Sequence, residues 1–187
     1  MDNIKISQIP NYNSDIIKSM LDGDNTYFPW YYNETTIGNH PKSKDKHQWT
    51  HAVVMDGEIL SPFYEQIKLY ISPFIPEYLT HKLLRCKINL NTPYKTKEVI
   101  LRHIDEDQQT LNSNNIGKNS NIENAVSYVY YVNDSDGPTR IFKNWWNTLK
   151  IHPKQGRLVR FPSTTSHSGN VPYKFECRIV INFVFID

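Results

Sequence analysis

Long hydrophobic segments are missing from this sequence. Nowhere do about 18 apolar residues follow one another, the length that a membrane-crossing helix needs. The N-terminal segment also lacks the basic stretch and apolar run of a secretion signal. We therefore expect no membrane association and a soluble, cytoplasmic protein, which for a viral protein would mean the host cytoplasm.

Cysteine and net charge are also scarce. Cys86 and Cys177 are the only two cysteines and stand outside any CxxC pattern, which excludes a disulfide framework and a zinc ribbon. We expect both thiols to be reduced and structural. The 21 basic and 19 acidic side chains leave a net charge of +2, so the sequence has no strong electrostatic footprint for nucleic acid.

The length suits one compact domain. A chain of 187 residues with 39% hydrophobic content predicts a single domain over 1–187, with a helical and irregular part over 1–83 and a β-rich part over 84–187. Apolar spacing predicts one helix over 14–21 and a second that opens at Ser61-Pro62. Between them, the aromatic and polar residues 24–51 show no clear period and predict an irregular arm.

Short β-type segments dominate from Leu84 onward. They are rich in β-branched and aromatic residues and are separated by Asn, Gly, Pro and Asp clusters, which predicts a sandwich or barrel. The segments are RCKINLN, EVILRH, AVSYVYYVN, TRIF, TLKIH, RLVRF and CRIVINFVF. The polar residues 107–124 predict a mobile loop that follows Asp105 and is placed to act as a substrate lid.

Three residues form a candidate metal-ligand set. In His103-Ile104-Asp105 the first and third side chains project from the same face of a strand, so both can reach one ion. A further histidine, His167, precedes the last strand. Two imidazoles and one carboxylate on one face of a metal are the ligands of non-haem iron(II) oxygenases, which leave the other positions open.

The ordered motifs from Arg102 to Phe185 resemble the catalytic core of prolyl 4-hydroxylase-type iron(II) and 2-oxoglutarate oxygenases. The matching motifs are HID at 103–105, Tyr131-Val132-Asn133, Gly137-Pro138-Thr139-Arg140-Ile141-Phe142, 153–161, His167 and Arg178. Asp136-Gly137-Pro138 stands where those enzymes have paired glycines. The resemblance implies a double-stranded β-helix, the jelly-roll core of cupins, with flanking helices.

The resemblance also implies a mechanism and a set of binding residues. Iron(II) would be held by His103, Asp105 and His167, and Arg178 would bind the distal carboxylate of 2-oxoglutarate, because a guanidinium grips a carboxylate bidentately. By the same resemblance, Tyr131 and Thr139 are further candidates for contacts with the co-substrate. If Arg178 points inward, strand alternation turns Val180, Asn182 and Val184 inward and Ile179, Ile181 and Phe183 outward against helices, which makes Asn182 a possible contact to cofactor or substrate. Oxygen would be consumed, with succinate and CO2 as co-products, and ascorbate is a further candidate cofactor.

The substrate stays open. Hydroxylation of an unactivated C–H bond in a protein, peptide or small molecule is the first hypothesis. A cupin-like binding module without turnover and a nucleic-acid-modifying oxygenase of the same fold are the alternatives. The even charge balance disfavours nucleic acid, although aromatic residues at 28–32 could stack on bases. Failure to convert 2-oxoglutarate would favour the binding module. Salt-dependent binding to single-stranded DNA would favour the nucleic-acid-modifying oxygenase.

Overall fold

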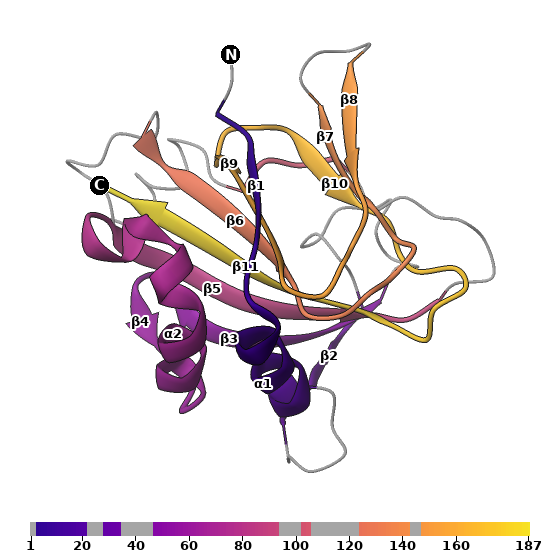
Figure 1. The fold of residues 1–187 in the computed structure, drawn as a ribbon, viewed down its shortest axis with the longest axis horizontal. Coiled ribbons are helices and arrows are strands. Elements are labelled where there is room, and N and C mark those ends of the chain that lie inside the picture. The colour runs from indigo at the N-terminus through magenta and orange to yellow at the C-terminus, as the bar shows by residue number, and fades with distance from the viewer. Residues whose placement is uncertain (1–2, 22–27, 35–46, 94–101, 106–123, 143–146) are drawn as a thin grey trace.

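The structure is a computed structural model that describes residues 3–21, 28–34, 47–93, 102–105, 124–142 and 147–187. Its main sheet is eight-stranded and antiparallel, in the order β1-β9-β6-β11-β5-β3-β2, with β4 paired to β3 (Figure 1). These strands are β1 (Lys5–Gln8), β2 (Tyr31–Asn33), β3 (Gln48–Met55), β4 (Glu58–Ile59), β5 (Lys82–Asn91), β6 (Val126–Tyr131), β9 (Arg157–Pro162) and β11 (Arg178–Ile186).

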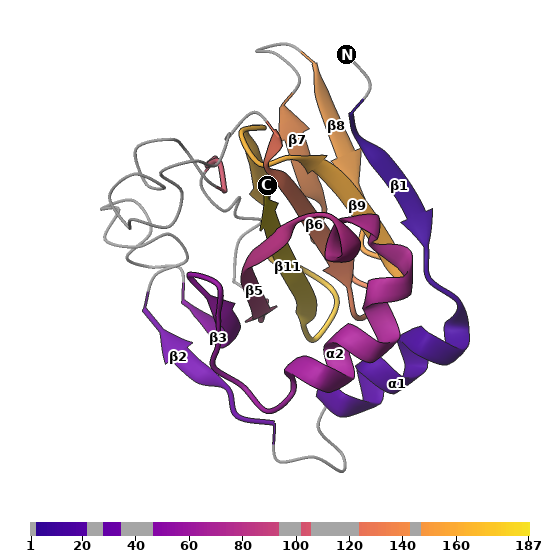
Figure 2. The same cartoon turned by 90° about the vertical axis from the view of Figure 1, so that its left-hand side faces the viewer.

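A smaller sheet faces one side of the main sheet. It has three antiparallel strands in the order β10-β7-β8, where β7 is Thr139–Phe142, β8 is Thr148–Ile151 and β10 is His167–Gly169. Two α-helices, α1 (Asn11–Leu21) and α2 (Tyr64–Ile71), lie on the opposite side of the main sheet (Figures 1 and 2). Short 3-10 helices, η2 (Ser72–Phe74) and η3 (Pro76–Leu79), connect α2 to β5. This confirms the predicted mainly β fold with flanking helices.

The helices form because their apolar residues recur every four positions. Ile17 and Leu21 of α1 are buried, as are Ile67 and Ile71 of α2, so each helix presents one apolar stripe to the sheet. Both helices were predicted. The second begins at Tyr64 rather than at Ser61-Pro62, because the Ser61 carbonyl and hydroxyl accept hydrogen bonds in the turn that precedes it.

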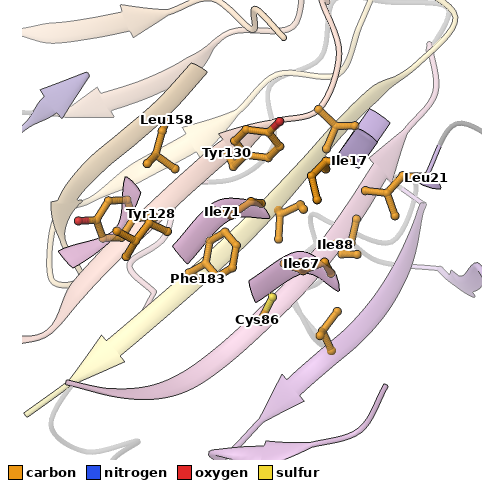
Figure 3. Close-up of a cluster of buried hydrophobic side chains, with 14 of the residues drawn as sticks. Ile17, Leu21, Ile67, Ile71, Cys86, Ile88, Tyr128, Tyr130, Leu158 and Phe183 are labelled. Carbon is orange, nitrogen blue, oxygen red and sulfur yellow. The ribbon is translucent and has the colours of Figure 1, made fainter. Parts of the chain in front are cut away.

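The main core fills the space between these helices and the large sheet. In Figure 3, side chains from both helices point toward strand residues that include Cys86, Ile88 and Phe183. Cys86 is fully buried, and burial raises the pKa of its thiol, which suits an inert structural cysteine. Cys86 and Cys177 are not joined in a disulfide.

A second, smaller core lies between the two sheets. It joins residues of β6, β9 and β11 to residues of β7 and β8, namely Val129, Tyr131, Ile141, Ile151, Val159, Phe161 and Val180. Face-to-face packing of two antiparallel sheets is the arrangement of a jelly roll. The edges of this second core border the cavity that holds the candidate site.

A buried polar cluster ties η3 to the main sheet. The Glu77 carboxylate accepts hydrogen bonds from the Tyr128 hydroxyl at 2.5 Å and from Arg160 Nε at 2.8 Å. Burial alone would raise the pKa of Glu77, but these two hydrogen bonds and the charge of Arg160 hold it below its ordinary value. The ionised carboxylate is therefore the form that the fold prefers.

Part of the predicted irregular arm over 24–51 forms strands, so the prediction is wrong for those residues. Residues 31–33 form β2, and 48–51 open β3, which pairs with the central strand β5. The part over 1–83 also supplies β1, an edge strand on β9. Such strands gain their hydrogen bonds from distant partners, so local composition does not reveal them.

Six of the seven predicted β-type segments form strands. Residues 98–101 of EVILRH and residues 107–123 of the predicted lid lie outside the described residues, so these predictions stay open. Strand β10, only three residues long, was not predicted and begins at His167. In the described part of the chain, no helix is long and apolar enough to cross a membrane.

Candidate active site

Two of the predicted metal ligands are brought together by the backbone. His103 and His167 form an isolated antiparallel bridge in which each amide donates to the other residue's carbonyl, at 2.9 and 2.8 Å. Side chains of directly opposed residues stand close together. The two imidazole rings accordingly lie with centroids 4.4 Å apart.

Asp105 completes the group. Its amide donates to the Ser163 carbonyl at 3.1 Å, and its Oδ2 lies 3.8 Å from Nε2 of His167. One potential ligand atom from each of His103, Asp105 and His167 lies within 4.8 Å of the others. Among the described residues this is the only such cluster of His, Cys, Asp and Glu side chains. Two imidazoles and one carboxylate fit a non-haem iron.

The hydrogen bond made by His167 favours ligation through one nitrogen. Its Nδ1 lies 3.0 Å from the Thr165 carbonyl, which can only accept, so Nδ1 carries the proton. The lone pair is then on Nε2, the nitrogen that faces Asp105. A ligating histidine commonly donates its other N–H in this way, which fixes the tautomer and the ring orientation.

Arg85 of β5 holds the Asp105 carboxylate. Its Nη2 donates to Oδ1 at 2.9 Å and also lies 3.3 Å from the Asp105 carbonyl oxygen. Burial would raise the pKa of Asp105, but the neighbouring His167 and then Arg85 keep it below its ordinary value. With Oδ1 engaged by Arg85, Oδ2 is the oxygen available to a metal.

The sequence reasoning missed Arg85. The signal was present, because Arg85, Lys87, Asn89 and Asn91 alternate with apolar residues along a predicted strand and therefore share one face. That face is turned toward the cavity, and the apolar residues between them pack under the helices.

Three of the four predicted co-substrate residues, Arg178, Thr139 and Tyr131, meet at the start of β11. Arg178 is buried, with 4% of its surface exposed, and its Nη2 donates to Thr139 Oγ1 at 2.9 Å. The same Thr139 oxygen accepts a hydrogen bond from the Tyr131 hydroxyl at 2.6 Å. Burial raises the pKa of Tyr131, and the nearby charge of Arg178 offsets part of that effect, so Tyr131 remains a neutral donor.

A buried guanidinium calls for an anion. Among the described residues no carboxylate pairs with Arg178, and its buried Nε has no hydrogen-bond acceptor. Burial accordingly lowers the pKa of Arg178. A carboxylate that entered here would supply both the charge and the missing acceptor. The residues present therefore fit 2-oxoglutarate as well as iron.

Side chains along β11 alternate between the cavity and the core under the helices, as predicted from the alternation of a strand. Arg178, Val180 and Asn182 line the cavity, whereas Ile179, Ile181 and Phe183 belong to the core under the helices. The predicted inward direction of Asn182 is therefore confirmed. Its role as a contact for co-substrate or substrate remains a prediction.

One cavity of about 270 Å³ contains both groups. It is lined by Gln48, Arg85, Lys87, Asn89, Asn91, His103, Ile104, Asp105, Val129, Thr139, His167, Gly169, Arg178, Val180 and Asn182. Tyr131 does not line it and is fully buried behind it. Its hydroxyl donates to Thr139, which does line the cavity, and a role of Tyr131 in holding 2-oxoglutarate stays a prediction.

The family is established by sequence. Residues 91–186, just over half of the chain, match the model of the 2OG-Fe(II) oxygenase superfamily. The chain therefore belongs to that superfamily, and iron(II) and 2-oxoglutarate are its cofactor and co-substrate. A comparison with curated protein sequences gives no match.

Solved structures share the fold at low sequence identity. A prolyl hydroxylase from Trichoplax adhaerens, in complex with a peptide fragment of hypoxia inducible factor, is 16% identical with a TM-score of 0.64, covering 100% of this chain and 84% of its own. A viral collagen prolyl hydroxylase from Paramecium Bursaria Chlorella virus-1, in complex with 2OG, is 13% identical with a TM-score of 0.56, covering 98% and 96%.

A third structure, HygX from Streptomyces hygroscopicus with nickel and 2-oxoglutarate bound, is 8% identical with a TM-score of 0.61, covering 98% of this chain and 82% of its own. The predicted double-stranded β-helix is confirmed by these likenesses.

Proposed function

We propose that this chain is a dioxygenase that hydroxylates an unactivated C–H bond of a peptide or small-molecule substrate. The observation that carries the proposal is the convergence, in one cavity, of His103, Asp105 and His167 with Arg178 and its partner Thr139. Prolyl hydroxylases are among the proteins with this fold, which supports a hydroxylase.

Each protein group has a separate task in this proposal. His103, Asp105 and His167 hold the metal on one face, and Arg85 keeps the Asp105 carboxylate ionised and oriented. Arg178, positioned by Thr139, receives the distal carboxylate of the co-substrate. Once bound, iron and 2-oxoglutarate supply the oxidising chemistry, in which oxygen is consumed and succinate and CO2 are released.

The lining of the cavity suits a small reacting group better than a nucleobase, which would need aromatic rings to stack on. Its lining is made of amide, cationic, imidazole, carboxylate, hydroxyl and aliphatic side chains, and no Phe, Tyr or Trp of the described residues belongs to it. Stacking on aromatic rings is how base-reading sites hold their target. The lining residues therefore favour a peptide or small-molecule substrate over a nucleic acid.

The test combines metal binding with co-substrate turnover. Purified protein should bind one iron(II), and His103→Ala together with His167→Ala should remove it. Arg140→Ala, on the opposite face of β7 from Thr139, is the matched control and should keep the metal.

Loaded wild-type protein should also convert 2-oxoglutarate to succinate at a slow basal rate. Full metal occupancy in the double variant would overturn the ligand assignment. No succinate from the loaded protein, with or without peptide and small-molecule mixtures, would favour a binding module instead.

A further inference from the structure

Lys87 lies in the wall of the cavity rather than on the outer surface. Side chains alternate along β5, so Cys86 and Ile88, both fully buried, pack under the helices while Lys87 and Asn89 line the cavity. In the β11 pairing, Lys87 stands opposite Asn182. Lys87 is half-buried, and the cavity that it lines is also lined by His103, Asp105 and His167.

The side chains that line the cavity carry more positive than negative charges, and Lys87 is one of the cations without a counter-ion. Three lining side chains are cationic, Arg85, Lys87 and Arg178, and among the described residues the only lining carboxylate is that of Asp105. Arg85 pairs with this carboxylate at 2.9 Å. Within the part of the chain that the structure describes, Lys87 has neither a carboxylate partner nor a hydrogen-bond acceptor. Burial and then the charge of Arg85 lower the pKa of Lys87, as expected for a cation that lacks a counter-ion.

The two unpaired cations stand at different places on the wall. Arg178 lies opposite Asn91 at the end of β5, whereas Lys87 lies four residues before Asn91 on that strand. At about 3.3 Å per residue, this places their backbones roughly 13 Å apart. Lys87 is two residues from Arg85, which touches Asp105, so it belongs to the metal end of the cavity. With the distal carboxylate of 2-oxoglutarate at Arg178 and its other carboxylate at the metal, the charge of Lys87 is left for another anion.

We propose that Lys87 binds a carboxylate of the primary substrate and so sets the enzyme's preference for an acidic substrate. This rests on the proposed function, because it takes Arg178 as the anchor of 2-oxoglutarate. A single lysine supplies one positive charge, which matches a carboxylate better than a phosphate carrying close to two negative charges. Asn89, whose Oδ1 has no partner among the described residues, offers a neighbouring acceptor for an N–H of the same substrate.

The test uses matched probes that differ in one charge. Protein loaded with zinc(II) and saturating 2-oxoglutarate is titrated with twenty N-acetyl amino acids and their twenty carboxamides, and dissociation constants are measured by ligand-observed NMR. We expect at least one acid to bind about tenfold or more tightly than its amide, the effect of one charge-assisted hydrogen bond. Lys87→Met should abolish the difference, and Lys87→Arg should keep most of it.

Two controls distinguish a failure of this proposal from a failure of the proposed function. Lys150→Met removes an exposed lysine from β8 and should leave the acid preference unchanged. The affinity of Lys87→Met for 2-oxoglutarate itself should stay within about threefold of wild type. Wild-type protein that binds no 2-oxoglutarate would overturn the proposed function and this inference together.

Normal 2-oxoglutarate binding with no acid in the panel preferred over its amide would overturn the inference alone. An acid-over-amide preference that persists in Lys87→Met would also overturn the inference alone. A loss of 2-oxoglutarate affinity in Lys87→Met as large as in Arg178→Ala would instead assign Lys87 to the co-substrate.

Discussion

Replacing Arg178 tests the co-substrate anchor separately from the metal. The guanidinium is buried and donates one hydrogen bond to Thr139, which leaves further N–H groups, including Nε, for a ligand. A hydrogen bond to a charged group contributes about 1.5 to 3 kcal/mol. Arg178→Ala should therefore weaken 2-oxoglutarate binding roughly ten- to hundredfold. Arg178→Lys keeps the charge but loses the planar fork, so its affinity should fall between the two.

Thermal unfolding of the zinc-loaded protein gives the same information without turnover. At a 2-oxoglutarate concentration about 100 times the wild-type Kd, binding stabilises the fold by about 2.7 kcal/mol. For a chain of this length, this raises Tm by roughly 5 to 10 °C. If the Kd of Arg178→Ala is hundredfold weaker, the same concentration stabilises it by only about 0.4 kcal/mol, a shift of about 1 °C.

Arg140→Ala provides the matched control, because Arg140 follows Thr139 on β7 but does not line the cavity. Its ligand-induced Tm shift should equal that of wild type even if its own Tm falls. An Arg178→Ala variant that binds zinc normally and shows the full wild-type shift would refute the assignment of Arg178.

Three further predictions concern groups around the site and in the core. Arg85→Met should leave Asp105 less well oriented and weaken metal binding roughly ten- to hundredfold in a chelator competition, and unchanged affinity would refute a positioning role. Glu77→Gln should cost roughly 1 to 3 kcal/mol of unfolding free energy at pH 7. Because the pKa of Glu77 is lowered in the fold, its contribution is present above the ordinary glutamate range and is lost as pH falls. The wild-type advantage in urea unfolding should therefore shrink toward acid, and a constant difference would contradict the pKa direction. Gly156→Ala should destabilise the fold by about 1 kcal/mol or more, because Gly156 has φ +78° and a Cβ there would meet the Ile9 carbonyl at 3.0 Å; an unchanged urea midpoint would refute this.

Sequence reasoning succeeded where a short pattern determines the geometry. The alternation of CRIVINFVF fixed which side chains of β11 face the cavity, because the period of a strand is two and one face is strongly apolar. His103 and Asp105 were recognisable as a pair for the same reason. The bridge between His103 and His167 also depends on β10 pairing with β7, which no local pattern in Ser166-His167-Ser168-Gly169 indicates.

The N-terminal strands could not be predicted from burial. All four residues of β1 are exposed, so the strand has no apolar face and its place follows from hydrogen bonds to β9 at the sheet edge. Strand β2 has only three residues, with Tyr31 and Tyr32 exposed. By contrast, β3 carries an apolar stretch around Val53 and Val54 that has the character of a buried strand and was open to prediction.

The strand β11 links the two halves of the cavity. On one side Arg178 reaches Thr139 of the small sheet, and on the other Asn182 stands opposite Lys87 of β5. Ile181 is fully buried under the helices between these two positions, so the spacing along the strand is held by the core. A change at Lys87 therefore alters the wall next to the metal while the backbone that carries Arg178 stays in place. This separation lets substrate preference vary on β5 without loss of the co-substrate anchor, which is why charge-removing substitutions at the two cations should have independent effects on binding.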